Sequence, residues 1–262
     1  MRKRLTQYFP LLTPLRTWQA KTCFTLRCTL DSRYHLKKDN ELLPYCIHST
    51  KASMINTYTG FDIRYQYNKA FNLKLLSKQF DHIIISPGQI LSFNYLSKNG
   101  DATTAYKDGL VLVNDDIVIG YGGGLCQLSN MIYEAALHTP LTILKRAGHT
   151  SQHLYDPNIT LQGIDATVSY GFADLQIQNN THALIQLSIT FPSETEIAVT
   201  FYSNEPYNHE IKLTNENLKV FQEKGKTYQQ VDVYRIDKTL NTKIKLHTNL
   251  CELAYKNKKE GN

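Results

Sequence analysis

Apolar residues recur at helical spacing in two segments of the chain. Between residues 126 and 137 they fall at every third or fourth position, on one face of a helix with 3.6 residues per turn: Leu128, Met131, Ile132, Ala135 and Ala136. Residues 68–80 carry an apolar face of the same kind. The pattern therefore predicts helices over 68–80 and 126–137, with Cys126 as the first residue of the second helix.

Short apolar runs separated by turn residues predict strands over much of the remaining sequence. Ser86-Pro87-Gly88 is a strong turn signal between two such runs, and Asn114-Asp115-Asp116 separates the arms of a hairpin. The predicted strands are 83–85, 90–93, 110–113, 117–119, 141–144, 166–170, 175–177, 183–189, 196–202, 227–236 and 242–247. We expect an α+β fold with a largely antiparallel sheet and a central helix that starts at Cys126.

The same pattern divides the chain into three parts. Residues 1–60 are rich in basic residues and turn formers, and we expect an irregular basic N-terminal segment there. Residues 61–192 hold the predicted helices and most of the predicted strands, and they form the expected core domain. Residues 193–262 continue with strands and carry no strong candidate for chemistry. We expect them to form a β-rich C-terminal extension packed on the core.

Positive charge is concentrated near the N-terminus. Residues 1–40 contain nine lysines and arginines against two acidic residues, whereas the whole chain has a formal net charge of +6. With Phe9, Leu11, Leu12 and Trp18 interspersed, residues 1–40 suit an anionic membrane surface, and a simply solvated basic face is the alternative. Binding to nucleic acid is not expected, because no recognisable binding module accompanies the charge.

The sequence predicts a soluble chain in a reducing compartment. No apolar run reaches the roughly 18 residues of a membrane span, and Pro10 and Pro14 interrupt the stretch that follows the basic N-terminus of a signal peptide. Five cysteines are an odd number in a mid-sized chain, which is typical of free thiols. We therefore expect a cytoplasmic protein, peripheral at the inner membrane face if residues 1–40 bind lipid.

Three consecutive glycines stand before the predicted helix that begins at Cys126. Gly122, Gly123 and Gly124 let the backbone turn tightly and approach a ligand with no Cβ in the way. Together with Gln127 they are candidate ligand-binding residues. At a helix N-terminus, free N–H groups and the helix dipole lower the pKa of a thiol, so Cys126 is a candidate nucleophile. The alternative is a buried cysteine that packs as a small hydrophobic residue.

Cys126 has two candidate partners later in the chain. A thiolate nucleophile needs a base, and often a third group that orients the base. His149 follows the predicted strand 141–144, and Asp165 enters the next predicted strand. We therefore propose Cys126, His149 and Asp165 as a candidate catalytic triad. The N–H of Gln127 or the amides of the glycine turn are candidates for an oxyanion hole.

Other assignments stay open from the sequence alone. His138 and His153 are rival bases, and Asp156 and Asp174 are rival acids. His149, His153 and Asp156 also form an alternative metal-binding set, although the neighbouring glycine and proline indicate a loop rather than one helical face. The pair Cys23 and Cys28 has no second cysteine or histidine pair at the spacing of a structural zinc site. We expect no metal and no other cofactor.

Several blocks of the sequence resemble the VanW family. They are SPGQILSF (86–93), YKDGL (106–110), GGGLCQLSN (122–130), HTPLTI (138–143), GH (148–149) and GIDATV (163–168), together with RLTQYFP (4–10) and GFD (60–62). The blocks occur in order over roughly residues 4–190, and the Gly-Gly-Gly-x-Cys-Gln block is intact. The resemblance implies a role in glycopeptide resistance or the bacterial cell envelope, and it supplies no reaction.

Two hypotheses of function follow. In the first, the chain is a cysteine-dependent acyl-transfer or amide-bond-cleaving enzyme on cell-wall precursors, in which Cys126 attacks the carbonyl, His149 moves the proton and Asp165 orients His149. In the second, the glycine turn and the helix N-terminus bind an anionic peptide or phosphate group of a peptidoglycan precursor without chemistry. Replacement of Cys126 by serine abolishes activity under the first hypothesis and leaves binding nearly intact under the second.

Overall fold

The structure, a computed structural model, describes residues 13–113, 116–154, 156 and 159–254. It confirms the α+β class, with sheets whose strands pair almost entirely antiparallel. The helices are α2 (Thr13–Leu30), the 3-10 helix η2 (Ser32–Tyr34), α3 (Arg64–Phe80), α4 (Phe93–Ser97) and α5 (Cys126–Leu137). The strands are β1 (Lys37–Lys38), β2 (Tyr45–Ser53), β3 (Ile83–Ile85), β4 (Ile90–Ser92), β5 (Asp108–Val113), β6 (Asp116–Tyr121), β7 (Thr142–Lys145), β8 (Ser151–Gln152), β9 (Gln176–Gln178), β10 (Ile185–Ser193), β11 (Glu196–Ser203), β12 (Ile211–Glu223), β13 (Lys226–Asp237) and β14 (Thr242–Leu253).

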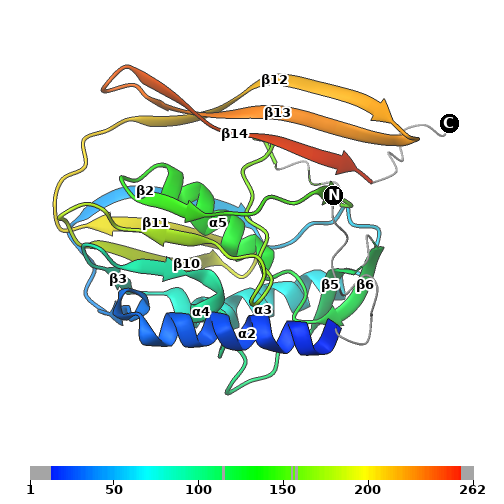
Figure 1. The fold of residues 1–262 in the computed structure, drawn as a ribbon, viewed down its shortest axis with the longest axis horizontal. Coiled ribbons are helices and arrows are strands. Elements are labelled where there is room, and N and C mark those ends of the chain that lie inside the picture. Colours follow the sequence, from blue (N-terminus) through cyan, green and yellow to red (C-terminus); the bar gives the residue numbers. More distant parts are fainter. Residues whose placement is uncertain (1–12, 114–115, 155, 157–158, 255–262) are drawn as a thin grey trace.

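A five-stranded antiparallel sheet in the order β1-β3-β10-β11-β2 forms the centre of the molecule (Figure 1). Its inner strands β10 and β11 pair along most of their length, with Leu187 opposite Phe201. Alternate residues of these two strands face the hydrophobic core and are almost completely buried: Ile185, Leu187, Ile189, Ile197, Val199 and Phe201. This alternation is the two-residue period of a strand with one face on the core.

Helices α3 and α5 complete the hydrophobic core. From α3 come Leu73, Leu76 and Phe80, and from α5 come Leu128 and Ile132, each set at the spacing of one helical face. Helix α5 contacts β2 and β11, and α3 contacts β10 and α5. In Figure 1, α5 lies between the central sheet and the outer strands β12–β14. Its first residue is thus held in the middle of the molecule.

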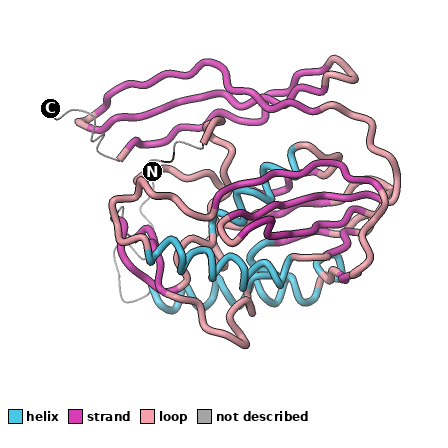
Figure 2. The backbone as a smooth tube through the Cα atoms, turned by 180° about the vertical axis from the view of Figure 1, so that it is seen from behind, coloured by secondary structure: helices cyan, strands magenta, loops and turns pink. Residues whose placement is uncertain are grey.

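Strands β12, β13 and β14 form a separate antiparallel sheet, seen as its own layer in Figure 2. Strand β8 extends this outer sheet in parallel, because Glu252 of β14 pairs with Ser151. The N–H of Glu252 also donates to the carbonyl oxygen of Thr150 at 2.9 Å. Since β8 follows His149 almost directly, the last strand of the fold holds the loop that carries this histidine.

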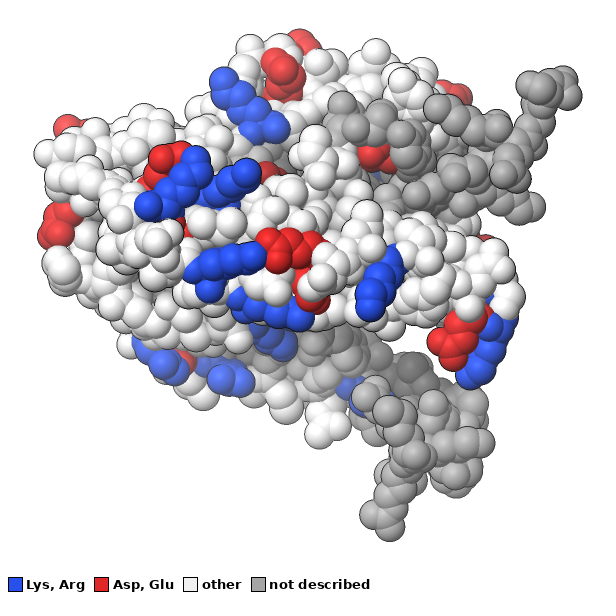
Figure 3. Space-filling model, turned by 90° about the horizontal axis from the view of Figure 1, so that it is seen from above, with Lys and Arg blue, Asp and Glu red and all other residues white. Residues whose placement is uncertain are grey.

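The face of the molecule seen from above carries basic and acidic side chains close together (Figure 3). The outer sheet carries three ion pairs: Lys226–Glu252 at 2.8 Å, Lys243–Glu216 at 2.5 Å and Lys245–Asp232 at 2.7 Å. The charges of the outer sheet therefore compensate one another locally.

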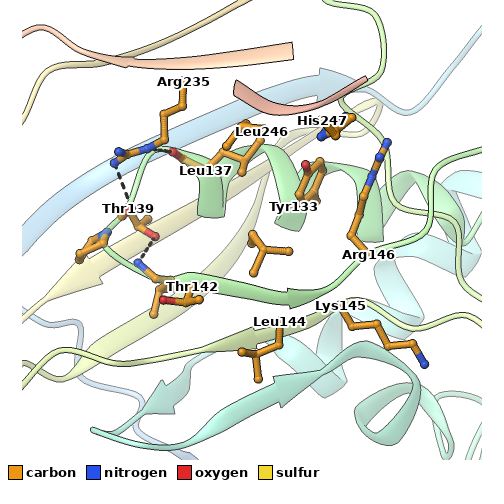
Figure 4. Close-up of a pocket in the computed structure, with 13 residues that line it drawn as sticks. Tyr133, Leu137, Thr139, Thr142, Leu144, Lys145, Arg146, Arg235, Leu246 and His247 are labelled. Carbon is orange, nitrogen blue, oxygen red and sulfur yellow. Dashed lines mark hydrogen bonds between the residues drawn. The ribbon is translucent and has the colours of Figure 1, made fainter. Parts of the chain in front are cut away.

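Arg235 of β13 joins the outer sheet to the C-terminal end of α5 (Figure 4). Its Nε donates to the carbonyl oxygen of Leu137 at 2.8 Å, and its Nη2 donates to the carbonyl oxygen of Thr139 at 3.4 Å and to the Tyr207 hydroxyl at 3.1 Å. Carbonyl groups at a helix C-terminus lack partners within the helix, and a cation there also suits the helix dipole. Arg235, Leu137 and Thr139 border a cavity of about 560 Å³ between α5, β7 and the outer sheet.

Residues 1–60 are more regular than the sequence analysis expected. They contain α2 and β2, and β2 is an edge strand of the central sheet paired with β11. Only a narrow side of α2, around Phe24 and Cys28, packs inward, and a single residue of β2, Thr50, is fully buried. Both elements therefore lack the strong apolar periodicity by which a helix or strand is predicted.

The predicted strand at 166–170 is also wrong. Apart from an isolated bridge between Ser169 and Ala173, this segment pairs with no strand in the described part of the chain. Its backbone bonds to side chains of α5 instead: the N–H of Ala166 donates to Asn130 Oδ1 at 2.8 Å, and its carbonyl oxygen accepts from the Ser129 hydroxyl at 2.6 Å. The segment is thereby placed beside the start of α5.

Some predictions fall on residues that the structure does not describe. These are the charges of Arg2, Lys3 and Arg4, the apolar residues Phe9, Leu11 and Leu12, the matching segment 4–10, and the turn residues Asn114 and Asp115. Among the described residues, no helix combines the length and the hydrophobicity needed to cross a lipid bilayer.

Candidate functional site

The glycine turn has a shape that requires glycine. Gly122 and Gly124 have φ angles of 70° and 90°, in the left-handed region that other residues rarely adopt. Gly123 is pressed against the backbone of Gly109, and a Cβ on Gly123 would lie 2.3 Å from the carbonyl carbon of Gly109. Gly122 and Gly124 line the large cavity described below, whereas Gly123 is buried behind them. The turn therefore delivers the chain from β6 to α5 in very little space.

Helix α5 begins at Cys126 and ends at Leu137, as predicted. The five apolar residues on which the prediction rested are all buried in the core. Cys126 itself is partly exposed and lines the cavity. Because it is the first residue of the helix, its sulfur lies at the end where the helix dipole favours negative charge.

The structure brings Cys126, His149 and Asp165 into contact. His149 is bound to one carboxylate oxygen of Asp165, Oδ2, by its ring Nδ1 at 2.6 Å and by its backbone N–H at 2.5 Å. The bond through Nδ1 leaves Nε2 for the sulfur of Cys126, and the two groups are close enough that each shifts the pKa of the other. Thiol, imidazole and carboxylate thus form a continuous series, the arrangement by which a nucleophile is activated. The catalytic role of the three residues stays a prediction.

Arg146 fixes the carboxylate end of the series. Its Nη2 lies 2.7 Å from Asp165 Oδ1, and its Nε donates to the carbonyl oxygen of Asp165 at 2.6 Å. The same Nη2 donates to the carbonyl oxygen of Gly163 at 2.9 Å. The side chains of Arg146 and Asp165 are 13% and 19% exposed, so this ion pair is largely shielded from water. Asp165 therefore offers His149 a rigid acceptor.

The surroundings of the three residues favour separated charges. Burial raises the pKa of the Cys126 thiol, but hydrogen bonds from the His149 ring, the Val168 N–H and the Thr167 hydroxyl outweigh burial and hold this pKa below its ordinary value. Burial lowers the pKa of His149, yet its hydrogen bonds to Asp165 and Cys126 raise that pKa to about 9. Both shifts act in the direction of a thiolate beside an imidazolium.

Cys126 and His149 open on a cavity of about 1020 Å³. Its walls come from α3, the β5–β6 hairpin, α5 and the loop before β9. The outer sheet contributes Gln229, Asn249 and Cys251. Sequence reasoning assigned no chemistry to that region, because nothing in its strand pattern marks these residues. The cavity is large enough for a small-molecule or peptide ligand.

The backbone N–H of Gln127, a candidate for the oxyanion hole, makes a hydrogen bond within the glycine turn. This N–H donates to the carbonyl oxygen of Gly124 at 3.2 Å and closes the turn, so it is not free to bind an oxyanion. The Gly123 and Gly124 amides stay the alternative candidates, and the oxyanion hole stays a prediction. The side-chain Nε2 of Gln127 donates to the carbonyl oxygen of Ser53 at 2.7 Å, while its Oε1 is buried without a hydrogen-bond partner among the described residues. Gln127 does line the cavity.

The rival residues have other contacts. His138 stacks on His48 with ring centroids 3.7 Å apart, outside the large cavity. His153 bonds to the Ser151 hydroxyl at 2.9 Å. Asp174 is buried and accepts hydrogen bonds from Ser92, Asn94 and Gln176. In the part of the chain that the structure describes, no three His, Cys, Asp or Glu side chains are grouped to hold a metal ion.

Comparison with known proteins gives the family. Residues 68–202 match the family described as VanW like protein. Over 97% of its length the chain is 38% identical to the vancomycin B-type resistance protein VanW of Enterococcus faecalis, of which the match covers 94%. It is also 27% identical to the uncharacterized protein YoaR of Bacillus subtilis, over 67% of this chain and 55% of that protein. No solved structure matches the chain.

The matched region contains the features of the site described above. It includes the glycine turn, Cys126, His149 and Asp165, and it ends within β11 of the central sheet. The expected resemblance is also confirmed over 97% of the chain, through the Enterococcus faecalis relative. The chain belongs to the VanW family.

Proposed function

We propose that the protein is a cysteine-dependent acyl-transfer or amide-bond-cleaving enzyme that acts on a cell-wall precursor. The observation that carries the proposal is the grouping of Cys126, His149 and Asp165 in the wall of a cavity of about 1020 Å³, with His149 bonded to Asp165 and coupled to Cys126 through their pKa values. A lowered pKa at the thiol and a raised pKa at the imidazole match a nucleophile and a general acid.

The reaction has two steps. In the first, the Cys126 thiolate forms a bond to the carbonyl carbon of an amide, and the C–N bond breaks as His149 gives its proton to the leaving amine. In the second, His149 takes a proton from water or from an acceptor amine, which attacks the thioester and releases the thiolate. Asp165 holds the ring in place and stabilises the imidazolium, as the acidic member of a triad does.

The biological setting is taken from the family. The Enterococcus faecalis relative is named a vancomycin B-type resistance protein, and we extend to this chain a role in glycopeptide resistance and cell-envelope metabolism. A peptide or amide bond of a cell-wall precursor is then the substrate. This assignment of substrate rests on the relative's name, whereas the assignment of chemistry rests on the site.

The pH dependence of alkylation at Cys126 tests the proposal. Reaction with iodoacetamide, followed for each cysteine by mass spectrometry, should give Cys126 an apparent pKa well below those of Cys28 and Cys251, whose pKa values burial raises to about 11. In His149→Ala the apparent pKa of Cys126 should rise, because burial remains while the hydrogen bond from the ring is lost.

The opposite result has a clear meaning. If Cys126 titrates like an ordinary thiol and His149→Ala leaves its apparent pKa unchanged, the proposal of an enzyme is contradicted. That result favours a protein that binds an anionic precursor group without chemistry. Cys126→Ser separates the two functions once a peptide substrate is known, since it removes the nucleophile and preserves the shape of the cavity.

A further inference from the structure

Lys69 extends along the glycine turn in the wall of the large cavity. It belongs to α3, and a Cβ added to Gly124 would lie 2.1 Å from Lys69 Cγ and 2.6 Å from its Cδ. The aliphatic part of Lys69 therefore packs on Gly124, two residues before Cys126. Lys69, Cys126 and His149 all line the same cavity.

The ammonium group of Lys69 has no ion-pair or hydrogen-bond partner among the described residues. Asp156, which also lines the cavity, attracts the ammonium group electrostatically. Burial lowers the pKa of Lys69 to about 8, so the group is still a cation at neutral pH. A desolvated cation without a bound partner is costly, and a bound anion would remove much of that cost.

A lysine of the same helix shows the usual alternative. Lys74 lies near the surface and forms an ion pair with Glu194 at 2.5 Å. Lys69 instead lines a cavity beside a candidate nucleophile, and its ammonium group carries three hydrogen-bond donors. Unlike Lys74, Lys69 is therefore a candidate ligand-binding group.

Glu134 and Lys69 give different parts of the cavity wall different charge properties. Glu134 lines the cavity two turns after Cys126 on α5, and burial raises the pKa of its carboxyl group. At 1.5 Å per residue, the eight residues between them place Glu134 about 12 Å further along the helix axis. An ionised Glu134 repels an anionic group of a ligand and a protonated Glu134 offers it no opposite charge, so an anionic group is favoured near Lys69.

We infer that Lys69 binds a carboxylate of the substrate, so that the enzyme takes short peptides or acylated amino acids with a free carboxylate. This inference rests on the proposed function, because it describes a subsite of the same cavity. One buried ammonium matches one negative charge. A phosphate carries more charge and ordinarily engages several strong donors. Among the described residues of this wall, the only other lysine or arginine is Lys51, which is exposed, and His149 is already paired with Asp165.

Two alkylating reagents that differ only in charge test the inference. Iodoacetate carries a carboxylate, whereas iodoacetamide is neutral. The ratio of their rates at Cys126 should exceed the ratio at the exposed Cys46 by about 10-fold, the effect of one charge-assisted hydrogen bond. Lys69→Met keeps the aliphatic part that packs on Gly124, and it should abolish that excess. Lys74→Met removes the same charge from the same helix and should leave the ratio unchanged.

The outcomes separate the subsite from the chemistry. A ratio that Lys69→Met leaves unchanged overturns the carboxylate subsite, even if Cys126 reacts rapidly with iodoacetamide. If Cys126 reacts with neither reagent, the proposed chemistry fails, and calorimetry with N-acetyl-dialanine, its C-terminal amide and inorganic phosphate decides the subsite. Binding of the free carboxylate that is about 10-fold tighter than that of the amide, and lost in Lys69→Met, supports it. Equal binding, absent binding or preference for phosphate overturns it.

Discussion

At the scale of single residues, Asp165 connects most of the candidate site. Its two carboxylate oxygens are divided between Arg146 and His149, and its backbone carbonyl oxygen also accepts from Arg146. Such a carboxylate sets both the orientation and the charge of the imidazole. Removal of the Asp165 charge should therefore change the pKa of His149.

Asp165→Asn should bring the pKa of His149 down from about 9 toward its ordinary value of 6.5, because the hydrogen-bond acceptor stays while the negative charge is lost. The histidine pKa values can be followed by NMR. Asp237→Asn is the matched control and should leave the pKa of His149 unchanged. It removes a carboxylate that contacts another histidine ring, that of His209, at the same 2.6 Å in the outer sheet. A His149 pKa that stays near 9 in Asp165→Asn would show that the carboxylate charge has no such effect.

The same pKa predicts how stability depends on pH. A folded-state pKa above the ordinary value means that protonated His149 stabilises the fold fully below about pH 6.5. This contribution declines as the pH rises and is lost above about pH 9. In Asp165→Asn the decline should shift to lower pH.

The sequence predicted the candidate site at this scale in part. Cys126 could be found because a glycine run and a periodic helix mark it, and His149 and Asp165 because a thiolate needs such partners. Lys69 and Arg146 carry no local signal, since an isolated basic residue in a sequence is most often solvated. Their roles depend on which segments the fold brings beside them.

At the scale of elements, prediction succeeded where one face of an element is buried. Both ends of α5 were predicted, and β13 was predicted to within a residue at each end. By contrast, α2 and β2 lie at the surface with few inward residues, so their hydrophobic pattern is weak. The strand β12 was missed for the same reason, because most of its residues are exposed or half-buried.

Arg235 is expected to contribute much of the attachment between the outer sheet and α5. Arg235→Ala should lower the free energy of unfolding by about 1.5–3 kcal/mol, the range for hydrogen bonds made by a charged group. Urea denaturation followed by circular dichroism measures this change. Lys243→Ala, which removes an exposed ion pair from the same sheet, should have little effect. Equal effects of the two changes would show that Arg235 does not join the layers.

At the scale of the whole molecule, α2 leaves a large apolar stripe uncovered. Leu15, Trp18, Leu26 and Leu30 are 61%, 65%, 54% and 83% exposed. Arg16 and Arg27 lie along the edge of this stripe on the same helix. An apolar stripe bordered by arginines suits the surface of an anionic membrane, and we propose that α2 contacts one.

Trp18 reports directly on that contact, because it is the single tryptophan of the chain. Vesicles that contain phosphatidylglycerol should shift its fluorescence to shorter wavelength, as burial in the lipid interface removes it from water. Vesicles of phosphatidylcholine alone should produce a smaller shift, and salt should weaken the response to the anionic vesicles. The double variant Arg16→Gln and Arg27→Gln should also respond more weakly to the anionic vesicles. A spectrum that no vesicle changes would rule out the contact.

The pairing of β14 with β8 has a consequence for the time at which the site forms during synthesis. Among the described residues, the main-chain partners of residues 150–152 are residues 252–254, about a hundred positions later in the chain. A ribosome adds about 5–20 residues per second, so several seconds separate the synthesis of His149 from that of the strand that holds its loop. A nascent chain therefore contains its thiol, imidazole and carboxylate well before it can hold them in their final arrangement.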